Sequence, residues 1–267
     1  MILVNGKPKD SVSITDRSFQ YGDGCFTTML TVDGKIQNWS LHIERMEACL
    51  NLLRIALPDW KEVGSWLSEI VLSEGKAGLK LHISRGEGGR GYSSVGAEAP
   101  IVTVSAFSFP GHYLTWQTSG VELGVCKRRL GHTPMLAGHK HNNRLEQVLL
   151  KAEADELGVA DAVVLDLNGN VVETTMANLF WVKDKTLYTP SMDNCGVAGT
   201  IRRLIIEEAQ ANGIETVVGA FGLEHLNDAE EVFMTNSILG VAPVIKISDK
   251  VFPIGPITRR FQESQSS

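Results

Sequence analysis

The sequence predicts an α+β protein built mainly from antiparallel strands, with a few amphipathic helices. Two observations support this class: stretches with strand and helix periodicity alternate along the chain, and neighbouring strands are joined by short Asx-Gly turns rather than by helical crossovers. The length of 267 residues suits one large or two modest domains. Periodicity is weak from Pro110 to Gly120, so we expect an N-terminal domain of residues 1–110 and a C-terminal domain of residues 111–267.

The N-terminal domain opens with strand and turn signals. Ile2 to Val4 and Phe26 to Val32 are strand-like, and the pairs Asn5-Gly6 and Asp33-Gly34 that follow them accommodate positive φ. Two helices with a single apolar stripe come next, one with Ser40 as its N-cap and apolar residues at Ile43, Met46, Leu50 and Leu53, the other from about Asp59 to Ser73. Strands at 79–84 and 101–107 then flank a glycine-rich loop.

The sequence predicts further strands and two helices in the C-terminal domain. After a strand at 121–126, a helix is expected from about Asn143 to Leu157, with inward-facing residues at Leu145, Val148, Leu149 and Ala152. The clearest hairpin of the chain joins strands 162–167 and 171–175 through Asn168-Gly169. Strands at 177–182, 186–189 and 231–235 and a helix at 201–212 complete the prediction.

Charge and composition exclude several classes of function. With 25 Lys and Arg against 31 Asp and Glu, the formal charge of −6 repels a polyanion, so nucleic acid is a poor partner. No apolar run approaches the roughly 20 residues that span a bilayer, and the N-terminus lacks a secretion signal, so we expect a soluble cytoplasmic protein with no membrane contact. The four cysteines are far apart in sequence, which predicts reduced, packed thiols and no metal site.

One motif matches a cofactor fingerprint that the sequence does not otherwise support. Gly86 to Gly91 fits G-x-G-x-x-G, but another strand follows it where a dinucleotide-binding protein has a helix. A nicotinamide or flavin site is therefore not expected. Arg85 and Arg90 on this loop suit an anionic small molecule, because guanidinium groups bind carboxylates in a bidentate manner, although solvated surface arginines fit the pattern equally well.

Four positions could carry chemistry. Lys140 precedes the helix expected at 143, and the positive end of a helix dipole disfavours its charge; a neutral amine can form a Schiff base, whereas an ordinary solvated lysine is the alternative. Glu173 interrupts an apolar strand and could simply face water. Gly199 and Thr200 immediately precede the helix expected at 201, whose free N–H groups suit phosphate, and Ser237 could add a hydroxyl donor or be a plain turn serine.

Taken in order, these segments resemble the fold-type IV pyridoxal-phosphate enzymes, the group that contains the D-amino-acid and branched-chain aminotransferases. The resemblance covers nearly the whole chain, and its motifs are Tyr21 to Thr28, His42 to Met46, the Lys140 segment, Glu173 to Phe180, Gly199 to Arg202 and Phe233 to Ser237. It implies a smaller N-terminal α/β domain and a larger, β-rich C-terminal domain with flanking helices. It also implies a homodimer whose active site is completed at the subunit interface.

The resemblance assigns the cofactor, pyridoxal 5′-phosphate, to particular residues. Lys140 would hold it covalently and act as the catalytic base, and Glu173 would pair with the pyridine nitrogen. Arg45, the backbone of Thr200 and Ile201, and Ser237 would hold the phosphate. Many relatives have an aliphatic residue followed by Thr at positions 200 and 201, so the side-chain hydroxyl is displaced by one position or missing here, while the backbone donors are retained.

Within that family the likeness is strongest to the lyases that release pyruvate from 4-amino-4-deoxychorismate and leave 4-aminobenzoate for folate synthesis. The motifs that carry it lie at 22–28, 84–93 and 140–147. They imply Thr28 as a proton donor or relay, and Arg90, Tyr92 and Asn236 as substrate-binding residues. The alternative is an aminotransferase of the same family acting on D-amino or branched-chain amino acids; those enzymes usually carry Glu at the position of Thr27. A silent binding protein that retains the fold is the rival from another class.

Overall fold

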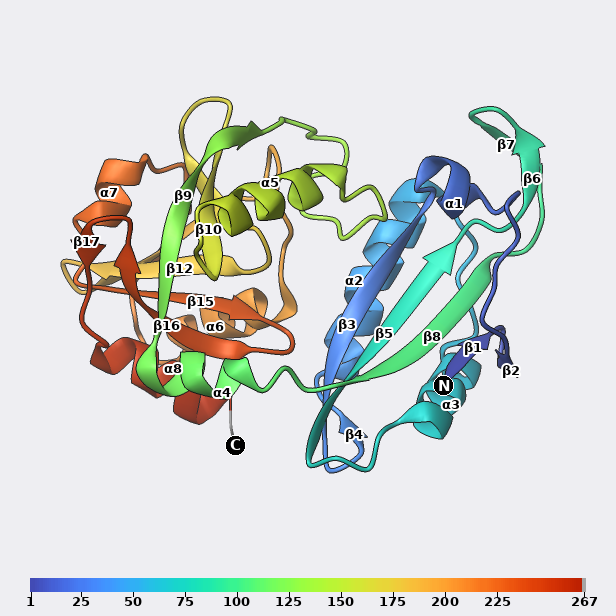
Figure 1. The fold of residues 1–267 in the computed structure, drawn as a ribbon, viewed down its shortest axis with the longest axis horizontal. Coiled ribbons are helices and arrows are strands. Elements are labelled where there is room, and N and C mark those ends of the chain that lie inside the picture. The colour runs from blue at the N-terminus through green and yellow to red at the C-terminus, as the bar shows by residue number, and fades with distance from the viewer. Residues whose placement is uncertain (266–267) are drawn as a thin grey trace. The chain divides into compact units, whose positions relative to one another are not determined.

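The computed structural model describes residues 1–265, which form two compact units (Figure 1). The first unit comprises Met1–Phe109 together with His139–Arg144, and the second comprises Pro110–Gly138 and the chain from Leu145 onward. The chain thus passes from the first unit to the second after Phe109, and the short segment that contains Lys140 belongs to the first unit. None of the helices in residues 1–265 has the length and apolarity needed to cross a bilayer.

The first unit is an antiparallel sheet with its two long helices on one face. Its sheet has the order β2-β1-β8-β5-β3-β4, with every pairing antiparallel. The strands are β1 (Ile2–Val4), β2 (Lys7–Pro8), β3 (Gly24–Val32), β4 (Lys35–Ile36), β5 (Lys76–Ser84) and β8 (Ile101–Ser108), and the helices are α1 (Arg17–Tyr21), α2 (Trp39–Leu53) and α3 (Trp60–Ile70). One core joins α2 and α3 to the sheet through residues such as Met29, Met46, Leu67 and Leu81.

Three details of the first unit differ from the sequence prediction. Helix α2 begins at Trp39, and its N-cap is Asn38 in the left-handed region, so Ser40 lies inside the helix. Asp59 caps α3 as its position suggests, but the helix ends at Ile70 because Val71 adopts extended dihedral angles. The glycine-rich loop folds into its own hairpin, β6 (Gly88–Arg90) and β7 (Ser93–Ala97).

The second unit is built on a nine-stranded mixed sheet with the order β11-β10-β9-β16-β15-β12-β13-β14, to which β17 adds at β16. Strand β9 runs parallel to both neighbours and β13 runs parallel to β14, while the remaining pairs are antiparallel. The strands are β9 (Val121–Leu130), β10 (Asp161–Asp166), β11 (Val171–Thr174), β12 (Asn178–Lys183), β13 (Thr186–Pro190), β14 (Thr216–Gly219), β15 (Glu231–Asn236), β16 (Gly240–Ile247) and β17 (Lys250–Val251). The helices are α4 (His112–Ser119), α5 (Leu145–Glu156), α6 (Thr200–Ala211), α7 (Leu223–Asn227) and α8 (Pro256–Ser264).

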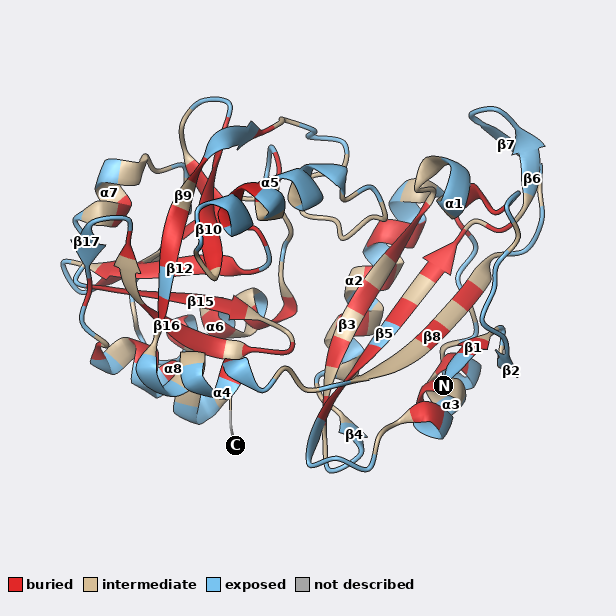
Figure 2. Ribbon diagram, in the orientation of Figure 1, coloured by how far each residue is buried: buried red, intermediate tan, exposed pale blue. Residues whose placement is uncertain are grey.

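Burial follows the sheets, with the buried residues concentrated on the strands of both units (Figure 2). Helices α6 and α8 pack with β12, β13, β15 and β16 around Phe180, Phe233 and Phe261, whereas α5 packs with β9, β10 and β11 around Leu150 and Val164. The second unit therefore buries apolar side chains on both sides of its sheet.

Helix α5 buries a different face from the one its apolar pattern predicts. Leu145, Val148 and Leu149 are 70%, 60% and 49% exposed, and the buried residues are Leu150, Glu153 and Ala154. The Glu153 carboxylate accepts hydrogen bonds from the backbone N–H of Lys127 at 2.5 Å and of Arg128 at 3.2 Å. These bonds compensate the buried carboxylate and orient the helix, which leaves its apolar stripe outward.

Candidate active site

Lys140 lies on an extended segment that pairs with the start of β3. The Phe26 N–H donates to the Lys140 carbonyl oxygen at 3.1 Å, and the Asn142 N–H donates to the Gly24 carbonyl oxygen at 2.9 Å. The Lys140 ammonium group stands 4.7 Å from the centre of the Phe26 ring. Because α5 begins only at Leu145, Lys140 is not in its first turn, and the helix-dipole argument made from the sequence is wrong.

The side chains of β3 alternate between the core and an open face. Cys25, Thr27 and Met29 are buried, whereas Phe26 and Thr28 are partly exposed and share the other face. Thr28 stands opposite Lys80 in the β3–β5 register, and the Lys80 ammonium group is 5.1 Å from the centre of the same Phe26 ring. The open face therefore presents two lysines at Phe26 and a threonine two residues away.

Lys80 is a candidate that the sequence analysis missed. It is exposed between Leu79 and Leu81, which are both fully buried, so strand alternation places it on the face of Phe26 and Thr28. The signal was present as a single cation in an apolar strand. Recognising it required the register between β3 and β5, which no local pattern reveals.

Arg45 reaches β3 from α2, through Thr27 on the core face. Its Nη2 donates to Thr27 Oγ1, and Thr27 Oγ1 lies 2.7 Å from His42 Nδ1. Burial lowers the pKa of His42 to about 3, with the charge of Arg45 acting in the same direction, so the imidazole is neutral near pH 7 and its Nδ1 can accept a hydrogen bond from the Thr27 hydroxyl.

The Arg45 guanidinium keeps an unused donor. Its Nε is buried, and no residue in the described part of the chain accepts a hydrogen bond from it. Burial lowers the pKa of Arg45 to about 10, and the nearby charge of Arg144 also lowers it. A cation with a spare buried N–H next to another guanidinium is a good partner for an anion such as a phosphate group.

Glu173 is buried in the second unit, which rules out the alternative that it faces water. It is 6% exposed, and its Oε2 accepts from the Val197 N–H at 3.1 Å and from Asn178 Nδ2 at 3.4 Å. Asn178 Nδ2 also donates to the Val197 carbonyl oxygen at 2.8 Å. Gly196, which precedes Val197, has φ +86°, and a Cβ there would come within 2.8 Å of Val172 Cγ1, so the position favours glycine.

The same loop leads into the N-terminus of α6, where backbone donors are open. The N-cap is Gly199, which has no side chain to cap the helix, and a Cβ there would lie 2.2 Å from Asn178 Oδ1. The Oγ1 of Thr200 lies 3.2 Å from the Oγ of Ser237. Uncapped N–H groups at Thr200 and Ile201, beside two hydroxyl groups, form an arrangement that suits phosphate.

The predicted substrate-binding residues differ in their exposure and in their hydrogen-bond partners. Arg90 and Tyr92 lie at the tip of the β6–β7 hairpin, where Tyr92 is 92% exposed. Asn236 uses its Oδ1 to accept from the backbone N–H groups of Ile238 and Leu239 at 2.9 and 2.8 Å, so it also shapes the turn after β15. Arg85 is not a free anion binder, because its guanidinium contacts Asp23 at 2.7 and 3.0 Å and the carbonyl oxygens of Leu53 and Arg54 at 2.6 and 3.0 Å.

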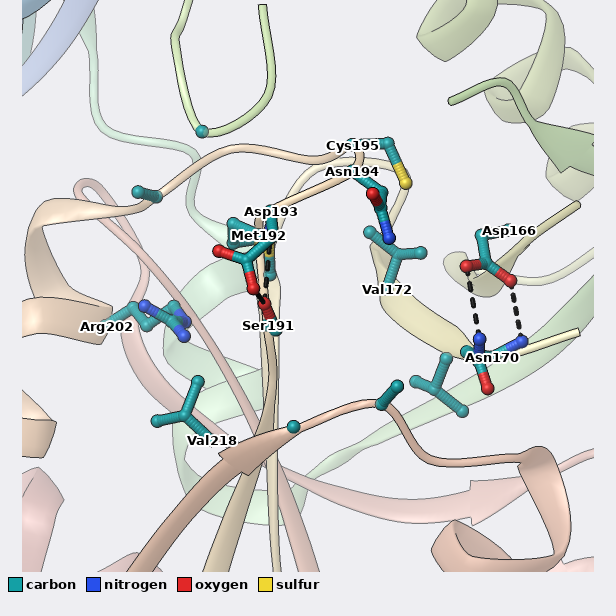
Figure 3. A pocket seen from close by; sticks show the side chains of 15 residues that line it. Asp166, Asn170, Val172, Ser191, Met192, Asp193, Asn194, Cys195, Arg202 and Val218 are labelled. Carbon is teal, nitrogen blue, oxygen red and sulfur yellow. Dashed lines mark hydrogen bonds between the residues drawn. The ribbon is translucent and has the colours of Figure 1, made fainter. Parts of the chain in front are cut away.

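The second unit also contains a cavity of about 590 Å³ (Figure 3). Its polar lining includes Asp166, Asn170 and Arg202, and Figure 3 shows Asp166 bound to Asn170. Val171 and Val172 of β11 line the cavity, and neither Glu173 nor Ser237 is among its lining residues.

Residues 24–247 match the model of the class IV aminotransferase family, and the chain belongs to that family, as its motifs predict. It is 56% identical over 266 residues to the aminodeoxychorismate lyase of Vibrio harveyi, an alignment that covers 98% of each chain. The crystal structure of 4-amino-4-deoxychorismate lyase from Pseudomonas aeruginosa matches with a TM-score of 0.93 at 36% identity, covering 99% of this chain and 97% of that one. The D-alanine aminotransferase of Listeria monocytogenes is 26% identical over 277 residues, covering 98% of this chain and 93% of that protein.

Proposed function

We propose that this protein is a pyridoxal 5′-phosphate-dependent aminodeoxychorismate lyase, which converts 4-amino-4-deoxychorismate into 4-aminobenzoate and pyruvate. The observation that carries the proposal is the 56% identity to a lyase over 98% of both chains, against 26% to a D-alanine aminotransferase. The Thr27-Thr28 pair supports it, since aminotransferases of this family usually carry Glu at the first position. Here that position is a threonine bonded to Arg45 and close to His42.

The residues present fit the cofactor. The buried Nε of Arg45 that lacks an acceptor, the uncapped N–H groups at Thr200 and Ile201, and the Ser237 hydroxyl are donors of the kind a phosphate needs. Glu173 is a buried carboxylate held by Val197 and Asn178, which suits a protonated pyridine nitrogen. Lys140 would hold the aldehyde carbon covalently through its amine. When bound, the cofactor supplies an electron sink for the carbon that loses its proton.

The proposed reaction is an elimination in which this chain moves two protons. The Lys140 amine, in its free form, takes the proton from the ring carbon that bears the substrate amino group. The ring gains a double bond and becomes aromatic as the neighbouring carbon–oxygen bond breaks, and the enolpyruvyl group leaves with the electron pair of that bond. Protonation of the enol carbon yields pyruvate. Thr28 is the proposed donor or relay, because it shares the open face of β3 with Phe26 and its lysines.

Two carboxylates of the substrate need cationic partners. We assign Arg90 as the bidentate one, with Tyr92 and Asn236 as further contacts. Lys80 joins this group on structural grounds, since it stands opposite Thr28 on an exposed position.

We also propose a homodimer. The chain leaves several large apolar side chains in water: Leu145 and Val148 on α5 are 70% and 60% exposed, and Tyr92 and Val95 on the hairpin are 92% and 86% exposed. A second copy that covered these surfaces would remove their cost of hydration.

The decisive assay supplies enzymatically generated aminodeoxychorismate to the cofactor-loaded protein. We expect 4-aminobenzoate and pyruvate in equal amounts, with no requirement for a keto acid. A parallel assay offers D-alanine or a branched-chain amino acid with 2-oxoglutarate. Amino transfer at a high rate, with no 4-aminobenzoate from the first assay, would replace the lyase by the aminotransferase alternative.

A further inference from the structure

The hairpin that carries Arg90 and Tyr92 has no apolar core to shape it. Every residue from Gly88 to Gly96 is exposed, and the backbone takes positive φ at Gly88, Gly89, Gly91 and Gly96. Glycine-rich, solvated backbone of this kind has high conformational entropy when nothing holds it. Within one copy of the chain, its shape therefore depends on the pairing of β6 with β7 and on contacts with the rest of the first unit.

One side chain provides most of the side-chain hydrogen bonds to this segment. Arg17, the first residue of α1, is only 3% exposed, and its guanidinium points at the hairpin backbone. Four carbonyl oxygens of the hairpin accept from it: Nη1 donates to those of Gly88, Gly91 and Ser93 at 3.3, 3.1 and 3.2 Å, and Nη2 donates to that of Tyr92 at 3.3 Å.

The guanidinium is itself anchored from the other side. Its Nε donates to Asp23 Oδ2 at 2.9 Å, and Asp23 also binds Arg85. Burial raises the pKa of Asp23, but the hydrogen bonds and charges of Arg85 and Arg17 outweigh it and hold the pKa below its usual value, so the carboxylate stays ionised. The Arg17 guanidinium also lies 5.0 Å from the centre of the Tyr21 ring, which meets the Tyr92 ring edge-on at 5.6 Å.

We propose that Arg17 is a positioning residue for substrate binding, which fixes the hairpin tip so that Arg90 and Tyr92 are presented in one conformation. Carbonyl oxygens of three consecutive residues, Gly91 to Ser93, turn inward to one guanidinium, which fixes the backbone between and beside the two side chains. A planar guanidinium can serve a carboxylate and four carbonyls together, with one Nη1 hydrogen shared between two carbonyls, whereas the three donors of a lysine cannot. This inference rests on the proposed function, in which Arg90 and Tyr92 bind the substrate.

The chain offers a matched control for this role. Arg17 and Arg85 bind the same carboxylate of Asp23, but the side chain of Arg85 contacts Leu53 and Arg54 where Arg17 contacts the hairpin. Comparing Arg17→Met with Arg85→Met therefore separates support of the hairpin from loss of an ion pair with Asp23. The two variants are compared in cofactor-loaded protein for KM and kcat with aminodeoxychorismate, and for the rate of trypsin cleavage after Arg90.

We expect Arg17→Met to raise KM on the order of tenfold or more with a smaller loss in kcat, because a misplaced binding group costs substrate capture first. Cleavage after Arg90 should accelerate in the same variant. Arg85→Met should change KM by less than about twofold, because the Arg17 guanidinium still holds the hairpin in that variant. Equal KM changes in the two variants, or a loss confined to kcat, would overturn the proposal.

A second route disturbs the same contact without removing Arg17. A Cβ at Gly89 would come within 2.9 Å of Arg17 Nη1 and 2.4 Å of the Ser93 carbonyl oxygen, so Gly89→Ala should reproduce the rise in KM with Asp23 still paired. In Arg17→Ala, millimolar methylguanidine should lower KM again, whereas methylammonium should not. Absence of rescue together with a normal KM in Gly89→Ala would also overturn the proposal.

The proteolysis measurement keeps this inference distinct from the proposed function. If the protein made no 4-aminobenzoate, the lyase assignment would fail while cleavage after Arg90 would still report on the hairpin. If lyase activity were normal and Arg17→Met loosened the hairpin with no change in KM, the lyase assignment would stand and the positioning role would be wrong.

Discussion

Glu173 in the second unit and the β6–β7 hairpin in the first are held in opposite ways. Glu173 is 6% exposed and bound to a backbone N–H and an amide, beside a loop whose glycine has no room for a side chain. The hairpin is exposed from Gly88 to Gly96, and four of its carbonyls accept from one guanidinium. Glu173 is thus part of a packed core, whereas Arg90 and Tyr92 lie on an exposed hairpin whose substitution should leave the unit folded.

This difference predicts that substitutions in the two regions have different effects on stability and activity. Changes near Glu173 or the start of α6 should alter chemistry or cofactor affinity and also carry a cost in stability, because buried polar groups there lose partners. Changes on the hairpin should alter substrate capture and leave the free energy of unfolding almost unchanged. The following experiments test the contrast, from the largest expected effect to the smallest.

Lys140→Ala should reduce multiple-turnover formation of 4-aminobenzoate by roughly 10³-fold or more, since both the covalent attachment and the base are lost. Borohydride reduction followed by peptide mass spectrometry should locate the cofactor adduct at Lys140 in the unaltered protein. Lys80→Ala is the matched control, because its ammonium group stands at the same Phe26 ring and its loss should leave the adduct in place. An adduct at another lysine would remove the central assignment.

Glu173→Gln should slow kcat by about 10²-fold, while affinity for the cofactor changes much less. Glutamine keeps an acceptor for the Val197 N–H but loses the charge that favours a protonated pyridine nitrogen. Glu153→Gln is the control: this buried carboxylate also accepts backbone N–H groups and pairs with Arg128 at 3.2 Å, but it belongs to no proposed site. It should lower stability by about 1 kcal/mol at unchanged kcat. An unaltered rate in Glu173→Gln would exclude the electron-sink role.

Acid should destabilise the protein through His42. Its pKa is 6.5 in an unperturbed imidazole and about 3 in the fold, so the unfolded chain takes up the proton first as the pH falls, and the stability present above pH 6.5 is lost progressively towards pH 3. In urea unfolding, the free energy of unfolding should fall by about 2 kcal/mol from pH 7 to pH 5 because of His42, and His42→Gln should lack this loss. Identical pH dependence in both proteins would show that the imidazole does not stay neutral beside Thr27 and Arg45.

Ser237→Ala should weaken cofactor binding by about fivefold, which corresponds to the loss of one hydrogen bond worth about 1 kcal/mol. Equilibrium titration of the cofactor-free protein, followed by absorbance, measures it. Ser191→Ala is the control in the same unit, because the Ser191 hydroxyl donates to Asp193 at the cavity of Figure 3, whereas the Ser237 hydroxyl lies beside that of Thr200. Equal losses in the two variants would argue against a phosphate contact at Ser237.

Much of the secondary structure could be predicted from local patterns. The Asn168-Gly169 hairpin, the start of α3 at Asp59 and the helix that follows Gly199 are all present, because turn and cap residues act on backbone groups only a few residues away. The outward stripe of α5 was not predictable, since a buried glutamate bound to the backbone of β9 decided which face turned inward. Helix α4 lay in a stretch without a clear period and was missed.

The candidate site, like the secondary structure, has features that the sequence predicts and others that only the tertiary structure reveals. Motif order along the chain was enough to single out Lys140, Arg45 and Glu173 and to predict the family, because residue type and spacing carry that information. Only the tertiary structure revealed Lys80 opposite Thr28, the orphaned Nε of Arg45, and Arg17 beneath the hairpin. Those relations depend on strand register and on which donors remain unpaired after folding, and both are decided by packing between segments far apart in the sequence.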